Sequence, residues 1–103
     1  MFGKILNFRF PSVSEVKLAA SFCSEKFGSK ISEFDIIGLN IFIGQSGDLN
    51  VSVKFDNPNS VNIFEESYKT IIADLKQSLV FKENNFVGVC TFTYEKEAAT
   101  TDL

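Results

Sequence analysis

Histidine and tryptophan are both absent from the 103 residues of this chain, and cysteine occurs only at Cys23 and Cys90. Without an imidazole, the chain has no Ser–His or Cys–His nucleophilic pair, no histidine ligand for haem and none of the histidines that most catalytic zinc sites use. Two cysteines far apart in the sequence cannot form a Cys-x-x-Cys metal loop or supply the four thiolates of a common iron–sulfur cluster. We therefore expect neither a metal nor a cofactor.

Positive charge is also scarce. Arg9 is the only arginine, the lysines are scattered singly, and the net charge is −3. Binding to nucleic acid or to an anionic membrane surface requires a basic patch that neutralises phosphates, so we expect neither partner. No apolar run approaches the roughly 20 residues of a membrane-spanning helix, and residues 1–9 lack the apolar core of a signal peptide. We therefore expect a cytoplasmic location.

Four strands are predicted from alternating apolar side chains, at residues 3–10, 33–43, 49–55 and 86–94. The first and third of these alternate most clearly between an apolar and a polar face. Twelve phenylalanines have no polar group to place, so we expect them in the core or at a subunit contact. Cys23 and Cys90 are expected to pack as small apolar side chains, and the count alone also allows a disulfide between them.

Two helices are predicted from apolar residues at intervals of three and four. Ser12 and Glu15 have the spacing of a capping box that starts a helix over residues 13–27, and Gly28 is expected just after its end. The second helix starts after an asparagine cap at Asn57, with a proline in its first turn. Its apolar stripe is the strongest periodic signal in the chain.

The order strand–helix–strand–strand–helix–strand is that of the ferredoxin-like βαββαβ fold, which belongs to the α+β class. We expect a four-stranded antiparallel sheet with both helices on one face and with the first and third strands in the middle. Residues 1–95 then form a single domain. Residues 96–103 are small and polar, and we expect them to form a frayed tail.

The second predicted strand is apolar on both faces. Its apolar side chains are Ile37, Leu39, Ile41 and Ile43 on one face and Phe34, Ile36 and Phe42 on the other. An edge strand of this kind favours aggregation unless something covers it. A second copy related by a two-fold axis is the simplest cover. We therefore expect a homodimer in which the free sheet faces meet.

A polar patch is predicted on the free face of the two central strands, made of Asn7, Arg9, Asn50, Ser52 and Lys54. An arginine and a lysine close together, under a lid from the partner, would hold the carboxylate or enolate of a small molecule. These five are therefore the predicted ligand-binding residues. Solvation of the face, or hydrogen bonds across the interface, would explain the same pattern. Catalytic residues stay unassigned.

Tyr68, Tyr94 and Asp35 are the remaining candidates for polar chemistry. Tyr68 lies on the apolar stripe of the second helix, so packing is its expected role. Tyr94 ends the fourth predicted strand, and the pattern does not decide between packing and a hydroxyl donor. Asp35 falls within the second predicted strand, where it is either partly buried or a charge that protects a sheet edge.

Three segments of the chain resemble the dimeric α+β barrel superfamily, whose best-known branch is the antibiotic biosynthesis monooxygenase-like family. They are the strand ILNFRF, the capped helix SVSEVKLAASFCSEKFG and the strand–turn–helix VKFDNPNSVNIFEESYKTIIADL, and the similarity covers residues 3–94. The resemblance implies the ferredoxin-like fold and a dimer. Its haem-degrading members use a histidine ligand and some cofactor-free oxygenases use a tryptophan, and this chain has neither.

Three functions stay open on this basis. The first is binding of a small molecule or a partner through the free sheet face. The second is a cofactor-free, monooxygenase-like enzyme that acts on a carbanion-forming substrate, and the third is a purely structural or accessory role. An enclosed cavity on the free face that contains Arg9 or Lys54 would favour a ligand, whereas a filled and dry contact would favour a structural role.

Overall fold

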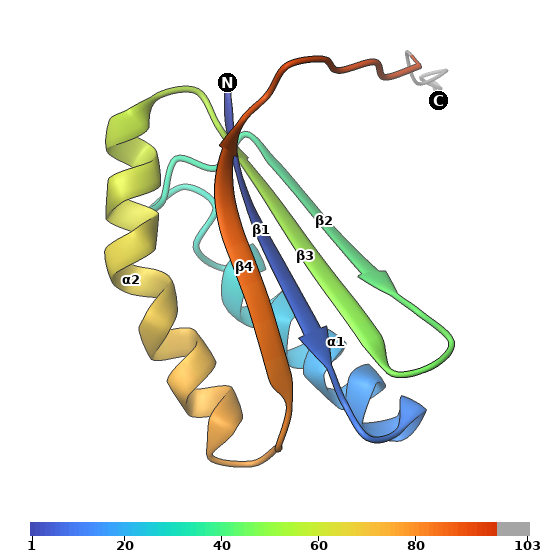
Figure 1. Ribbon diagram of the computed structural model, residues 1–103. Coiled ribbons are helices and arrows are strands. Elements are labelled where there is room, and N and C mark those ends of the chain that lie inside the picture. The colour runs from blue at the N-terminus through green and yellow to red at the C-terminus, as the bar shows by residue number, and fades with distance from the viewer. Residues whose placement is uncertain (97–103) are drawn as a thin grey trace, which may run out of the picture.

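The chain folds as six elements in the predicted order. The computed structural model describes residues 1–96, and its elements are β1 (Phe2–Arg9), α1 (Val13–Gly28), β2 (Gly38–Ile43), β3 (Asp48–Phe55), α2 (Pro58–Lys76) and β4 (Lys82–Val89). The strand order is β2-β3-β1-β4, and each neighbouring pair is antiparallel. Both helices cover one face of the sheet and leave the other open (Figure 1). The predicted ferredoxin-like α+β fold is confirmed.

The predicted helix starts are confirmed in detail. The Ser12 hydroxyl oxygen accepts a hydrogen bond from the backbone N–H of Glu15 at 3.3 Å and donates one to the Glu15 carboxylate at 2.8 Å. Asn57 caps α2 through its side-chain oxygen, and Pro58 occupies the first turn. The expected role of Gly28 is wrong. It is the last residue of α1, and the cap that follows it is Ser29 in the right-handed conformation, which needs no glycine.

The core lies between the sheet and the helices, with Phe64 of α2 at its centre. The Phe64 ring is 5.2 Å from Phe55 of β3, 5.5 Å from Phe34 and 5.8 Å from Phe27 of α1, measured between ring centroids. Each fully buried phenylalanine contributes about 2–3 kcal/mol of transfer free energy. These aromatic contacts join both helices to the sheet, as the apolar stripes predict.

The second strand is shorter than predicted, because residues 33–37 are not part of it. Residues 29–35 form turns, and Asp35 has a positive φ of 56°, a conformation that aspartate tolerates better than most residues. This turn directs both Phe34 and Ile36 into the core, where they are 3% and 8% exposed. The expectation that Asp35 lies in a strand is therefore wrong. Its side chain is on the surface, where it accepts a hydrogen bond from Ser60 at 3.2 Å.

The predicted two-sided apolar edge is therefore also wrong. On β2, the side chains that face the helices are Leu39, Ile41 and Ile43, and only Phe42 is apolar on the free face. The apolar alternation in the sequence continues through residues 33–37, which are not part of the strand. Alternation indicates the face of a residue only within a strand.

The fourth strand lies earlier in the chain than predicted. Residues 82–89 form β4, so Asn84 and Asn85, predicted as a turn, are inside the strand. Asn84 pairs with Asn7 of β1, and Asn85 accepts a hydrogen bond from Lys4 at 2.9 Å. The last bond of this ladder runs from the Cys90 N–H to the Met1 carbonyl at 2.9 Å.

The chain beyond β4 also differs from the prediction. Residues 91–94 have no neighbouring strand among residues 1–96, and Cys90 is half-buried rather than in a strand. Most of the predicted frayed tail, residues 97–103, lies outside the described residues.

Gly47, in the hairpin between β2 and β3, offers a first prediction. It has a positive φ of 99°, and a Cβ there would clash with the carbonyl oxygen of Phe10. Gly47→Ala should therefore lower the free energy of unfolding by about 2–3 kcal/mol. Gly28→Ala is the matched control, because nothing lies within 4 Å of its Cβ position and alanine favours a helix by about 0.5–1 kcal/mol. Urea unfolding of both variants measures the two changes in the free energy of unfolding, which should have opposite signs. Equal changes would contradict the turn geometry at Gly47.

Candidate functional site

The free face of the sheet is organised in rows that cross all four strands. The register places Gly38 of β2, Lys54 of β3, Gly3 of β1 and Gly88 of β4 in one row. The next row holds Asn40, Ser52, Ile5 and Phe86, and the one after it holds Phe42, Asn50, Asn7 and Asn84. The first row thus has a single side chain, because the other three positions are glycine.

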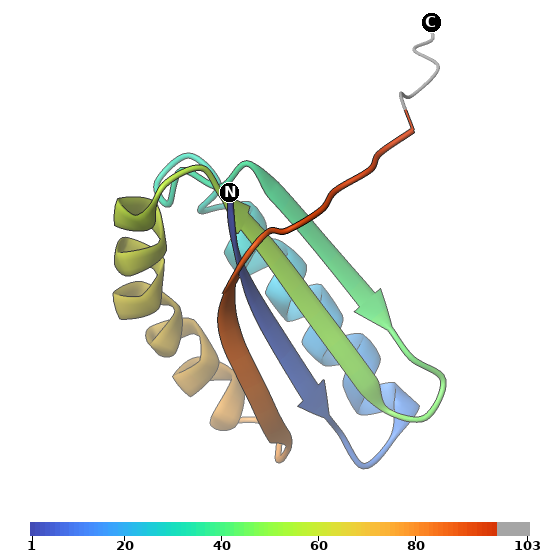
Figure 2. The same cartoon turned by 45° about the horizontal axis from the view of Figure 1, so that its top comes forward.

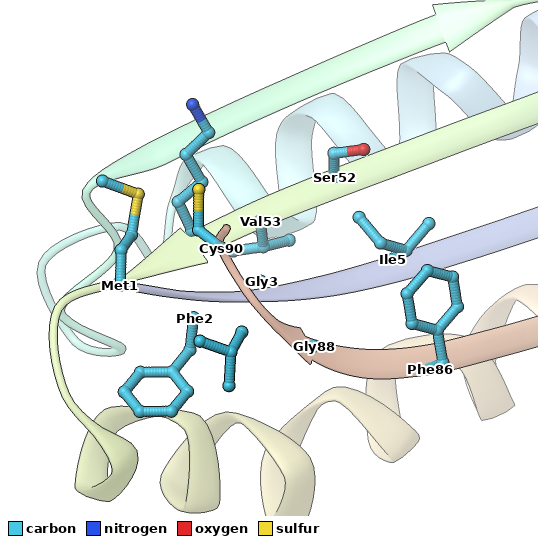
Figure 3. Close-up of a pocket in the computed structure, with 11 residues that line it drawn as sticks. Met1, Phe2, Gly3, Ile5, Ser52, Val53, Phe86, Gly88 and Cys90 are labelled. Carbon is cyan, nitrogen blue, oxygen red and sulfur yellow. The ribbon is translucent and has the colours of Figure 1, made fainter. Parts of the chain in front are cut away.

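The glycine row leaves a hollow of about 370 Å³ on the free face, at the end of the sheet near the N-terminus. Figure 3 shows its boundary. Met1 and Cys90 lie at one end, and Ile5 and Phe86 project from the next row at the other. A Cβ on Gly3 would have only one heavy atom within 4 Å, the backbone oxygen of Val53, so the space above this glycine is open. The walls are mostly apolar, as is typical of small-molecule sites.

Lys54 supplies a positively charged side chain to this hollow. Its aliphatic stem lies over Gly38, where a Cβ would be 3.1 Å from the Lys54 Cδ. Among residues 1–96, Lys54 has no ion-pair partner. Ser52 also lines the hollow, and its hydroxyl donates a hydrogen bond to the Asn50 side-chain oxygen at 2.7 Å. The hollow therefore combines apolar walls, the ammonium group of Lys54 and a hydroxyl oxygen that can still accept.

The five predicted site residues separate into two groups. Lys54 and Ser52 line the hollow, and the Asn50 side chain, bonded to Ser52, donates a further hydrogen bond to the Asn7 oxygen at 2.8 Å. Arg9 lies at the opposite end of the face and donates to Asp48 at 2.7 Å, with both side chains more than half exposed. The structure therefore places Arg9 away from Lys54 and pairs its charge with Asp48.

Lys4 is a buried charge that was not among the predicted site residues. It is 2% exposed and faces the helices, where its ammonium group lies 2.7 Å from the Glu65 carboxylate and donates to Asn85. The same group lies 4.7 Å from the centre of the Tyr68 ring, a cation–π distance. The signal was present, because alternation along β1 places Lys4 on the same face as Leu6 and Phe8.

The tyrosines and cysteines have contrasting environments. The packing role predicted for Tyr68 is confirmed, because it is 8% exposed and stacks on Phe64 with ring centroids 5.4 Å apart. Tyr94 is 76% exposed. Both cysteines are free, and burial raises the pKa of the Cys23 thiol to about 11, so this thiol stays protonated at neutral pH. Cys90, in contrast, lines the hollow.

Residues 1–96 contain no helix that is long and apolar enough to cross a membrane. Nor does this part of the chain bring together three or more cysteine, aspartate or glutamate side chains that could hold a metal ion.

Comparisons with known proteins identify the fold. No protein-family model matches the chain, and no curated protein matches it at a significant level. Among solved structures, it is similar to a dimeric ferredoxin-like protein from an uncultured marine organism, with a TM-score of 0.71 and 20% identity over 93% of this chain and 100% of the other. A candidate antibiotic biosynthesis monooxygenase from Deinococcus radiodurans is similar with a TM-score of 0.65 and 13% identity, over 100% of this chain and 99% of the other.

A second dimeric ferredoxin-like protein from an uncultured marine organism has a TM-score of 0.56 and 10% identity, over 88% of this chain and 97% of the other. The chain has the fold of these proteins. The ferredoxin-like fold that the sequence resemblance implies is therefore confirmed. The sequence identities are too low to extend the similarity to activity.

Proposed function

We propose that this protein is a homodimer joined through the free sheet face, and that the hollow around Lys54 binds a small, largely apolar anion. The observation that carries the proposal is the glycine row, which opens space on the face around a single lysine. A ligand of this class has a flat or branched apolar body and one carboxylate or enolate. The body would contact Ile5 and Phe86, and the ammonium group would hold the anion.

The apolar side chains of the free face support the dimer. Phe42 of β2 and Phe86 of β4 are 62% and 56% exposed in the single chain, and both lie on the uncovered face. Phenylalanines placed at both edges of a face are costly in water and are suited to a subunit contact. Two of the structurally similar proteins are described as dimeric. The hydrogen-bonded Asn7 and Asn50, and the Arg9–Asp48 pair, would then lie in the contact between the sheets.

Binding of 2-naphthoate tests the ligand class, with the neutral 2-naphthamide as its isostere. We expect the carboxylate to bind more tightly and to shift the backbone amide resonances of Gly3 and Gly88 in nitrogen-edited NMR spectra. Lys54→Gln should weaken 2-naphthoate binding about tenfold, the value of one charge-assisted hydrogen bond, and should leave 2-naphthamide unaffected.

Lys82→Gln is the matched control. Lys82 also projects from the free face, but it lies in the row of Arg9, at the opposite end from the hollow. It should therefore leave both affinities unchanged. Equal affinity of wild type and Lys54→Gln for 2-naphthoate would contradict the ligand proposal and favour the structural role.

Catalysis has less support than binding. A monooxygenase-like reaction on a carbanion-forming substrate needs a group that removes a proton from carbon. The titratable side chains that line the hollow are those of Lys54 and Cys90, and among residues 1–96 neither one is hydrogen-bonded to a side-chain base that could activate it. Binding is therefore the function that these side chains support best.

A further inference from the structure

Residues 91–94, which we call the arm, have the sequence of a strand but no strand to pair with. They read Thr-Phe-Thr-Tyr, a combination of β-branched and aromatic residues that favours extended structure. Phe92 is 84% exposed and Tyr94 is 76% exposed, the highest and third-highest values among the large exposed apolar side chains of residues 1–96. Two neighbouring aromatic side chains this open to water are typical of a contact surface.

The arm begins at the rim of the hollow. Cys90, which lines the hollow, makes the last ladder bond with Met1, and the arm follows directly. Figure 1 shows the segment after β4 leaving the sheet at the end that carries the N-terminus, and in Figure 2 it passes in front of β3 and β2 before it extends away from the sheet. The aromatic side chains of the arm are therefore close to the hollow along the chain, yet they cover nothing on their own subunit.

We infer that in the dimer the arm of one protomer lies on the free sheet face of its partner, where Phe92 and Tyr94 complete the wall of the partner's hollow. The inference rests on the proposed dimer and adds how the hollow of each protomer is covered. Because a two-fold contact is reciprocal, one exchange covers both arms and both hollows. If the arm bound a different protein instead of a second copy, the free sheet face of each protomer would stay uncovered.

The reach of the arm fits this position. Residues 91–94 span about 13 Å when extended, at about 3.3 Å per residue. Three spacings between neighbouring strands, from β4 to β2, amount to about 14 Å. The arm is thus about as long as the sheet is wide.

The area of the face gives a second reason. A stable dimer buries about 800 Å² of accessible surface on each partner, so a contact through this face gains from any apolar surface added to it. The two aromatic side chains of the arm would add apolar surface to that of Phe42 and Phe86. A partner tyrosine would also bring a hydroxyl donor toward the anion that Lys54 holds.

The absence of tryptophan makes a direct test available. Phe92→Trp introduces a single indole into the arm, and Val80→Trp is the matched control, because Val80 is 80% exposed in the connection between α2 and β4. We expect the emission of the Phe92→Trp dimer to be shifted to the blue and to move to the red when the protein is diluted until it dissociates. The Val80→Trp variant should emit at the wavelength of a solvated indole throughout.

A photoreactive benzoylphenylalanine at position 92 then identifies what the arm contacts. Dimers assembled from mixed unlabelled and isotopically heavy chains should give crosslinks between light and heavy peptides, at residues around Gly3 and Gly88. Light scattering is measured on the same samples. The arm exchange is overturned, and the dimer proposal left standing, by a Phe92→Trp dimer that emits like the Val80→Trp dimer or by crosslinks that join only peptides of the same label. A monomer overturns both.

Discussion

Phe86→Asp should convert the dimer into monomers of 11.5 kDa. Phe86 lies on the free face beside Ile5 and is 56% exposed in the single chain, so in the proposed dimer it is buried by the partner. Loss of a buried interface aromatic costs about 2 kcal/mol or more. Because each dimer contains the substitution twice, we expect the dissociation constant to rise by about a thousandfold.

Val80→Asp is the control for Phe86→Asp. Val80 is an exposed apolar residue close to β4 in the chain, but it lies outside the free face. It should leave the dimer intact. Sedimentation velocity across a concentration series measures both constants, and far-ultraviolet circular dichroism verifies that both variants are folded. A Phe86→Asp variant that sediments as the wild type does would exclude the free sheet face as the interface.

Glu65→Leu should lower the free energy of unfolding by about 3 kcal/mol, because it leaves the Lys4 ammonium group buried without its counter-charge. The Lys4 side chain is 3% exposed, whereas the Glu65 side chain is 37% exposed. Asn85 and the Tyr68 ring remain as partners of Lys4 but carry no full charge. For a domain of this size the expected loss corresponds to a melting temperature lower by roughly 15 °C.

Lys4→Met should behave differently, although it breaks the same ion pair. Methionine has a similar length and suits the apolar surroundings, and Glu65 can turn toward water. We therefore expect a change within about 1 kcal/mol, and the double variant Lys4→Met/Glu65→Leu should recover most of the stability that Glu65→Leu alone loses. Thermal and urea unfolding of the wild type and the three variants give a double-mutant cycle, which measures the interaction between Lys4 and Glu65. Losses below about 1 kcal/mol for both single variants would show that the pair contributes as a surface ion pair does.

The hydrogen-bonding pattern of the central strands explains how far the sequence could predict the site. Alternation in β1 and β3 correctly placed Asn7, Asn50, Ser52 and Lys54 on the free face, because strand periodicity alone decides the face of a residue. The hollow was not predictable in this way. It depends on Gly3, Gly38 and Gly88 sharing a row, and that row exists only through the register of three separate strand pairs. The same register put Arg9 opposite Asp48.

Local signals determined the element order, both helix starts and the apolar faces of β1, β3 and α2, because caps and periodicity act over a few neighbouring residues. The tertiary structure decided where β2 begins and β4 ends, since a strand extends only where another strand pairs with it. It also decided that Lys4 is buried against Glu65 and that Lys54 stands alone in its row. Those outcomes depend on residues distant in the chain, whose proximity no short stretch of sequence encodes.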